Sequence, residues 1–275
     1  MKKILAFFLL LMVAVPLFGC QRREEKTSSD PSWQEVQQDK KLVVGVDISK
    51  FPMAFSEQEG AYSGFDADLA REVCRRLDLN IEFQNVSVDN VQGLLDDGII
   101  DCVWSNFIST PERDEAFTLS SSYFTVRHVL LVPEASECEE LADFAEKQLG
   151  VISASTSLAS LERTEMFRGA LAGTTEYGTP QEALEGLLAG EVDGLLLDET
   201  VARYFILYQG GLRLILGEDG SPESLGEDSL VIGFPRGDEA LKAKVEEALA
   251  TMNRDQIFTE YSKKWFGEDI SLSNE

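Results

Sequence analysis

The chain has 275 residues, enough for two modest domains, and a hydrophobic content of 44%, enough to build a buried core. Its formal net charge of −25 at pH 7 argues against nucleic acid as a partner, because phosphate binding requires clustered Lys and Arg. Such acidity is typical of a well-solvated surface. Attraction of cationic solutes is the alternative interpretation.

Residues 1–19 predict a secretory signal peptide. Lys2 and Lys3 precede an apolar run, Ile4–Val15, that is shorter than the roughly 20 residues of a membrane-spanning helix. The run leads into Leu-Phe-Gly-Cys, ending at Cys20, which resembles a bacterial lipoprotein cleavage box. That resemblance implies a lipid such as palmitate on Cys20 and a protein held outside the cytoplasm, with residues 20–32 as a flexible tether. A plain signal peptide that happens to contain a cysteine is the alternative.

Cysteine and histidine content indicates no metal site, no cofactor and no catalytic residue. The remaining cysteines, Cys74, Cys102 and Cys138, are odd in number, so at least one is unpaired unless it bonds another molecule. We expect Cys74 and Cys102 to be small core residues, because their surroundings are apolar. His128 is the only histidine. With no metal-ligand spacing around it, we expect it to be packed or solvated.

Residues 64–77 predict an amphipathic helix. Asp66 is a residue type that favours the N-cap, and Gly64 allows the chain to turn before it. The apolar residues that repeat at helical spacing form one face: Ala70, Val73, Cys74 and Leu77. On periodicity alone, this is an ordinary surface helix of an α/β protein.

The same stretch, Gly-Phe-Asp-Ala-Asp-Leu-Ala-Arg-Glu-Val-Cys-Arg-Arg-Leu, resembles the signature of the bacterial extracellular solute-binding proteins of family 3, which take up polar amino acids. Ala67 departs from it, since the family usually has a larger aliphatic residue there. The resemblance covers nearly all of residues 40–268. It implies a type II periplasmic-binding-protein-like α/β fold of two lobes, each a mixed sheet flanked by helices, with the ligand in the cleft between them.

The resemblance also implies the division of the chain. Lobe 1 is expected to be discontinuous, formed by residues 33–126 and 229–268, and lobe 2 by residues 127–228, with residues 269–275 as a tail. The long extended segment 123–133 is expected to cross from one lobe to the other. A similar helix-then-strand layout in residues 94–101 and 187–193 is weak evidence for two related lobes.

The first candidate site residues follow a predicted buried strand, residues 42–47. In parallel α/β sheets, ligands bind beyond the carboxyl ends of strands, where Asp47 and Phe51 lie. The resemblance implies that an aromatic ring from this loop stacks on the ligand, and Phe51 is the best candidate. A core position is the alternative for Phe51 and is expected for Phe55. For Asp47, ligand contact and a role as a turn acid both remain open.

A second predicted strand, residues 99–104, is followed by Ser105, Asn106 and Phe107. Pro111 then marks the first turn of a helix. The resemblance implies that Ser105 and Asn106 help to hold the α-ammonium of an amino acid, and that Arg113 pairs with its α-carboxylate. A guanidinium fork fits a carboxylate with two parallel hydrogen bonds. Without the resemblance, Arg113 would be interpreted as a surface residue. Ile108 and Ser109 depart from the family pattern, which leaves one hydroxyl contact open.

In the second half of the chain, small residues follow the predicted strand 149–152. Backbone N–H groups at a helix N-terminus form an anion site, and the resemblance implies that Ser155 and Thr156, with Ser157 beside them, bind the ligand carboxylate. Simple N-capping is the alternative. Asp198 ends the predicted strand 192–198 and corresponds to the family acid that binds the α-ammonium. Its alternative is also an N-cap.

These features predict an extracytoplasmic lipoprotein that closes on an amino acid and delivers it to the permease of an ABC importer. We expect a monomer that contacts the membrane through its lipid and catalyses no reaction. The alternatives are a small-carboxylate lyase or dehydratase on the same fold, or a ligand-sensing module for a separate receptor. The ligand side chain stays open, because Asp47 favours a polar or cationic one while Phe51, Phe107 and Ile108 favour an apolar one.

Overall fold

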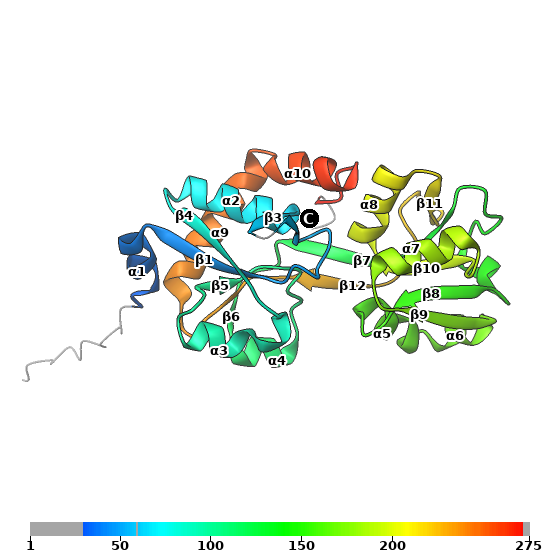
Figure 1. The fold of residues 1–275 in the computed structure, drawn as a ribbon, viewed down its shortest axis with the longest axis horizontal. Helices are drawn as coiled ribbons and strands as arrows, with labels where there is room; N and C mark the ends of the chain where they lie inside the picture. The colour runs from blue at the N-terminus through cyan, green and yellow to red at the C-terminus, as the bar shows by residue number, and fades with distance from the viewer. Residues whose placement is uncertain (1–29, 59, 272–275) are drawn as a thin grey trace, which may run out of the picture.

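The computed structural model describes residues 30–58 and 60–271. The predicted signal peptide, Cys20, most of the predicted tether and residues 272–275 of the predicted tail lie outside these residues. Two helix-flanked sheets lie side by side and are joined by two long neighbouring strands, β7 (Phe124–Pro133) and β12 (Ser224–Leu230) (Figure 1). This is the predicted α/β architecture.

The first sheet has the strand order β4-β1-β5-β13-β6. β1 is parallel to β4 and β5, whereas β13 is antiparallel to its neighbours. Apolar clusters cover both faces, as is typical of a largely parallel sheet. The strands are β1 (Lys41–Val46), β4 (Asn80–Asn85), β5 (Cys102–Val103), β6 (Thr118–Leu119) and β13 (Gly233–Phe234). The helices around them are α1 (Ser32–Asp39), α2 (Phe65–Arg76), η1 (Val88–Asn90), α3 (Val91–Asp96), α4 (Pro111–Ala116), α9 (Glu239–Arg254) and α10 (Ile257–Phe266).

The second sheet has the order β11-β7-β10-β8-β9, and β12 pairs with β7. One apolar cluster lies between this sheet and α7 and α8, and another lies on the side of α5 and η2. The remaining strands are β8 (Gln148–Ile152), β9 (Gly173–Tyr177), β10 (Gly194–Asp198) and β11 (Leu212–Leu214). The helices are η2 (Leu141–Phe144), α5 (Thr156–Arg163), α6 (Glu165–Ala170), α7 (Pro180–Ala189) and α8 (Glu199–Gln209).

The two joining strands run antiparallel, with Phe124 opposite Leu230 and Val129 opposite Ser224. The predicted lobe boundaries, at residues 126 and 228, fall inside these strands. A separate hairpin of β2 (Phe55–Gln58) and β3 (Ala61–Ser63) precedes α2.

Helix α2 buries the predicted apolar face, but it does not use the predicted N-cap. The helix begins at Phe65, and Gly64 is the N-cap residue, with no side-chain cap. Asp66 is fully buried inside the first turn, and its carboxylate binds groups from other segments. The prediction that Asp66 caps the helix is therefore wrong, because the N-cap lies two residues earlier, at Gly64, and the first turn directs the Asp66 side chain into the protein.

Gly64 is required by its backbone and by its neighbour. Its φ of 128° lies in a region that side-chain-bearing residues avoid, and a Cβ would lie 2.2 Å from the carbonyl oxygen of Met53. We expect Gly64→Ala to lower the free energy of unfolding by at least about 2 kcal/mol, measured by urea denaturation. Gly190→Ala is the control, since Gly190 has a φ of 74° but open space at Cβ. Equal losses in the two variants would contradict the steric argument.

The returning segment 229–234 is split, because β12 pairs with β7 up to Leu230 while β13 joins the first sheet. The segment that begins at Leu141 is a single 3₁₀ turn closed by a capping box. The predicted strand 99–104 is regular only over β5. The cysteines Cys74, Cys102 and Cys138 are free and buried, which confirms the core position predicted for the first two.

Two kinds of feature are absent from the described residues. Within residues 30–58 and 60–271, no helix has the length and apolar character needed to cross a membrane. The same residues contain no group of three or more His, Cys, Asp or Glu side chains placed to hold a metal ion.

Candidate functional site

Asp47 follows β1 at the end predicted for the site, and its carboxylate is bound locally. One oxygen accepts hydrogen bonds from the backbone N–H and the hydroxyl of Ser49, at 3.0 and 2.6 Å. The other lies 3.3 Å from the backbone N of Val88. The residue is 9% exposed. These contacts are those of a turn acid that organises the loop, and a ligand contact by Asp47 stays a prediction.

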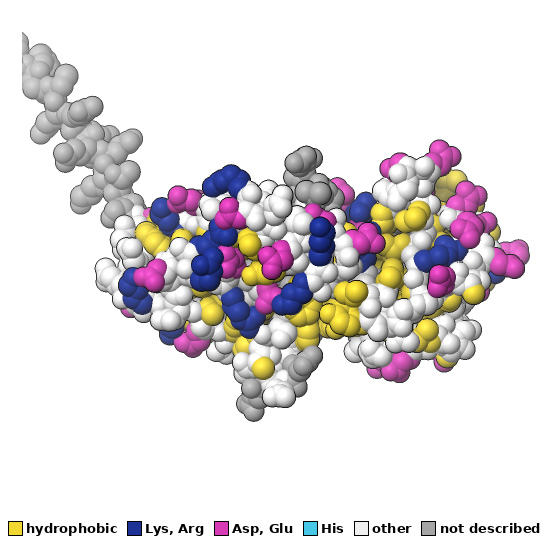
Figure 2. Space-filling view, turned by 90° about the horizontal axis from the view of Figure 1, so that it is seen from above, with side chains coloured by type: hydrophobic (Ala, Val, Ile, Leu, Met, Phe, Trp, Pro, Cys, Tyr) yellow, Lys and Arg dark blue, Asp and Glu magenta, His cyan; other side chains and the backbone are white. Residues whose placement is uncertain are grey.

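Phe51 lies on the same loop and packs across to the second half of the molecule. Its ring meets Tyr204 of α8 edge-on at a centroid distance of 4.5 Å and lies 6.4 Å from Phe205. Phe55 contacts it at 5.2 Å. Figure 2 shows hydrophobic side chains gathered where the two halves meet. Phe51 is therefore placed between the halves, where an aromatic cover for a ligand is expected.

The loop after β5 is held by buried hydrogen bonds. Ser105 is fully buried and exchanges hydrogen bonds with the backbone N–H and carbonyl of Asp47, at 3.0 and 3.1 Å. Asn106 has a left-handed backbone, with a φ of 48°, and its N–H donates to Asp66 at 2.8 Å. Phe107 is fully buried in the apolar cluster next to α3. The loop is thus a rigid platform at the predicted ammonium site.

Arg113 lies in α4, a short helix capped by Thr110. Its guanidinium lies over the ring of Phe107 at 4.0 Å and donates to the carbonyl of Ile108 at 2.7 Å. Stacking and a hydrogen bond on one nitrogen fix the plane of a guanidinium. Ile108, which departs from the family pattern, therefore contributes to the site through its backbone carbonyl. The sequence did not predict this contact.

The N-terminus of α5 shows the predicted capping geometry. Ser155 is the N-cap residue, and its hydroxyl accepts from the backbone N of Leu158 at 3.0 Å. Ala154 before it is left-handed, with a φ of 56°, in a position where the resembled family often has Gly. The capping alternative therefore holds for Ser155, and its predicted carboxylate contact remains untested. Thr156 begins the helix and faces a polar cluster.

That cluster surrounds Asp198, the last residue of β10. Ser157, 1% exposed, donates to the Asp198 carboxylate at 2.9 Å, and Nε2 of His128 lies 3.9 Å from it. Burial raises the pKa of Asp198, while His128 and Ser157 oppose that shift. Asp198 precedes α8 but makes no side-chain cap to it. Asp198 thus occupies the N-cap position of α8, as the alternative expects, but its carboxylate is bound by Ser157 of α5 and not by the helix backbone.

His128, on β7, is fully buried, as one of its two predicted states requires. Its Nε2 lies 2.9 Å from Asp228 of β12 and 3.2 Å from the Thr156 hydroxyl. Burial opposes ionisation of Asp228, but hydrogen bonds from His128 and Thr156 hold its pKa below the usual value. Because an ionised carboxylate only accepts, Nε2 of His128 carries the proton.

A serine completes this arrangement: Ser160 Oγ lies 2.8 Å from His128 Nδ1. Ser160, His128 and Asp228 thus have the order of a hydrolase triad. However, Ser160 is 1% exposed, and its oxygen also accepts from Arg163 at 2.9 Å. A buried hydroxyl that is already bound by two side chains fits a structural role better than that of a nucleophile. The sequence did not predict Ser160 or Asp228, since only strand pairing places them beside His128.

Asp66 gives the protein a measurable pH response. Burial raises its pKa to about 7, from an ordinary value of 3.8. The folded state therefore holds this proton more tightly than the unfolded state, and stability from this group is lost as pH rises from about 4 through about 7. We expect Asp66→Asn to gain stability relative to the unmodified protein over that range, by on the order of 1 kcal/mol per pH unit. Denaturation at pH 4.5 and pH 8 measures it, and a pH-independent difference would contradict it.

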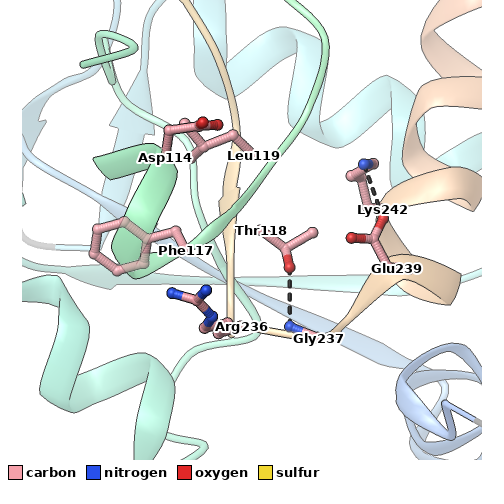
Figure 3. Close-up of a pocket in the computed structure, with 8 residues that line it drawn as sticks. All are labelled: Asp114, Phe117, Thr118, Leu119, Arg236, Gly237, Glu239 and Lys242. Carbon is pink, nitrogen blue, oxygen red and sulfur yellow. Dashed lines mark hydrogen bonds and ion pairs between the residues drawn. The ribbon is translucent and has the colours of Figure 1, made fainter. Parts of the chain in front are cut away.

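A surface pocket of about 390 Å³ lies elsewhere, at the edge of the first sheet. Figure 3 shows it bounded by α4, β6 and the start of α9, with Thr118 accepting from the backbone N of Gly237 and Lys242 paired with Glu239. None of the predicted site residues lines it. The predicted site between the halves therefore remains the better candidate.

A model of the bacterial extracellular solute-binding proteins, family 3, matches residues 42–268. The chain belongs to this family. The family 3 chain is 25% identical over 280 residues to the L-cystine-binding protein TcyA of Bacillus subtilis, covering 98% of this chain and 99% of the relative. The resemblance found in the signature helix is thereby confirmed.

Solved structures of similar proteins agree with the fold. A polar amino acid ABC uptake transporter substrate-binding protein of Streptococcus thermophilus is 27% identical, with a TM-score of 0.74, over 90% of this chain and 94% of that one. An ABC uptake transporter substrate-binding protein of Streptococcus pneumoniae with bound histidine is 30% identical, with a TM-score of 0.68, over 89% and 99%. The predicted type II binding-protein fold is confirmed.

Proposed function

We propose that this family 3 protein binds an amino acid between two lobes and delivers it to the permease of an ABC importer. The observation that carries the proposal is Asp198. Its carboxylate lies at the end of β10, where sheets of this kind bind ligands, and it is held there by Ser157 rather than used as a helix cap. A partly buried, oriented carboxylate at this position suits an α-ammonium group.

A positive charge that can bind the ligand carboxylate lies in the half of the molecule that does not contain Asp198. Arg113 has its guanidinium plane set by Phe107 and Ile108, which suits a carboxylate. Ser155 and Thr156 would add backbone N–H groups at the start of α5. With Arg113 in one lobe and Asp198 in the other, a zwitterion binds both lobes only when they close, so closure depends on the ligand.

The lobes that we propose are residues 33–126 with 229–268, and residues 127–228. Two antiparallel strands connect them, β7 and β12, and these would act as the hinge. Phe51 would cover the ligand side chain, Asp47 would shape the loop beside it, and Ser105, Asn106 and Phe107 would form the floor. This arrangement requires no chemical step, so we propose a binding protein and not an enzyme.

The ligand class follows from the relatives. TcyA is named as an L-cystine-binding protein, and the Streptococcus pneumoniae structure contains histidine. We propose an L-amino acid whose α-groups bind as above. We also propose a monomer outside the cytoplasm, anchored by a lipid on Cys20, which keeps the protein near its permease.

A thermal-shift screen tests the proposal. The protein without residues 1–20 is heated with each of the twenty amino acids, L-cystine and small dicarboxylates without an α-ammonium. A ligand that binds the folded state raises the melting temperature by mass action. We expect at least one amino acid to do so and the dicarboxylates to fail. A shift by dicarboxylates alone would show that the role given to Asp198 is wrong, and incubation with them would then be examined for product.

A further inference from the structure

We propose that Asp66 is a positioning residue, which couples the ligand loop at Asn106 to the start of the hinge strand β7 by binding both segments through one buried carboxyl. The inference rests on the proposed function, because it concerns how amino-acid binding and lobe movement are linked. Asp66 itself is expected to make no contact with the ligand.

The geometry of Asp66 is that of a bridge. One oxygen accepts from the backbone N–H of Asn106 at 2.8 Å, and the other accepts from the hydroxyl of Tyr123 at 2.7 Å. The side chain is on α2, and the carboxyl has no exposed surface. Hydrogen bonds in such a low-dielectric site are stronger than in water, so the three segments are held as one unit.

At one end of the bridge is a strained residue. Asn106 adopts a φ of 48°, which is uncommon for residues other than Gly and persists only where neighbours hold it. Its Oδ1 is buried and accepts no hydrogen bond from the described residues. Buried polar atoms are normally satisfied, so an oxygen in this state favours a donor such as an ammonium group. Asp66 fixes the backbone that presents it.

At the other end, Tyr123 lies where both joining strands meet the first sheet. Its backbone N donates to the carbonyl of Leu230, the last residue of β12, at 3.0 Å. Its ring meets Trp104 edge-on at 5.7 Å, and Trp104 immediately precedes the ligand loop. A change in the angle of β7 therefore moves Tyr123, which is linked to Asn106 by the two hydrogen bonds of Asp66.

The ionisation of Asp66 is expected to make amino-acid affinity depend on pH. Its pKa is raised to about 7 by burial, and Tyr123 is the titratable group in contact with it. Burial raises the pKa of Asp198, and hydrogen bonds from His128 and Thr156 lower the pKa of Asp228 against the effect of its burial, but both acids belong to the other sheet. The charged carboxyl accepts both hydrogen bonds more strongly. Amino-acid affinity is therefore expected to increase as pH rises through 7, by a contribution that depends on Asp66.

The test measures affinity and dissociation rate for the amino acid with the largest thermal shift in the screen above. Tyr123→Phe removes one hydroxyl from the bridge, and we expect a loss of affinity of at least fivefold with faster dissociation. Asp66→Asn should flatten the rise in affinity between pH 6 and pH 8. Val245→Ala, at a fully buried position on α9 in the same apolar cluster as Tyr123 but with no side-chain hydrogen bond to the bridge, is the control for a general loss of stability.

Two results would overturn the inference. One is a Tyr123→Phe protein with affinity within twofold of the unmodified protein. The other is an equal loss of affinity in Val245→Ala at a similar melting temperature, since the effect would then be one of stability alone. A screen in which no amino acid binds the unmodified protein would instead reject the proposed function, so the two failures are distinguishable.

Discussion

Asp198→Ala is expected to weaken amino-acid binding by about 2 to 5 kcal/mol, which is roughly 30-fold to several-thousand-fold in Kd. The reason is that the ammonium group would enter a site from which water is excluded without its charged partner. Part of the loss is the cost of leaving that ammonium unpaired. Isothermal titration with the amino acid selected by the thermal-shift screen measures the effect.

Two further variants make this measurement specific. Glu162→Ala removes one negative charge from an exposed position of α5, and affinity should stay within about twofold because exposed charges are screened. Asp198→Asn keeps the shape and the hydrogen bond from Ser157 but removes the charge. If both Asp198 variants bind as tightly as the unmodified protein, the ammonium is held elsewhere and the orientation of the ligand has to be reversed or abandoned.

Glu199→Ala is expected to lower the free energy of unfolding by about 3 to 5 kcal/mol. Glu199 is 2% exposed, and its two oxygens bind Arg127 at 2.8 and 3.1 Å and Arg203 at 2.7 Å. Removing the carboxylate leaves two guanidinium groups, neither of them fully exposed, without their shared anion. Urea denaturation monitored by circular dichroism measures the loss.

The outer end of the same network is the matched control. Arg203 also binds Glu268 at 2.8 Å, but the Glu268 side chain is 67% exposed. Glu268→Ala should therefore cost less than about 1 kcal/mol, since exposed ion pairs contribute little. A Glu268 variant as unstable as the Glu199 variant would mean that the contact between α8 and the end of α10 matters more than the buried charge.

Local signals in the sequence were sufficient for the elements around the site. The spacing of apolar residues predicted α2, and Pro111 predicted the first turn of α4. Strand β9 was not predicted, because its residues alternate between half-buried and exposed positions and form no apolar run. The same limit applied to β11, which is only three residues long.

Relations between distant residues were not predictable from local patterns. The local pattern favoured Asp66 as an N-cap residue. Its actual partners, Asn106 and Tyr123, lie 40 and 57 residues later in the sequence, and only the packing of α2 brings them together. Asp228 lies 100 residues from His128, and they meet only because β7 and β12 neighbour each other. The resemblance to the family supplied Arg113 and Asp198 as candidates, where residue type alone left each of them with a structural alternative.

The place of β13 in the first sheet affects the order in which the two sheets can fold during synthesis. This strand lies between β5 and β6, so residues 233 and 234 are inserted between segments that were made more than 100 residues earlier. The second sheet, by contrast, comes from one continuous stretch, residues 124–230. Contacts between distant segments form slowly. During synthesis, the first sheet therefore cannot be completed until β13 has been made. The second sheet, whose strands all precede β13, can be complete before it.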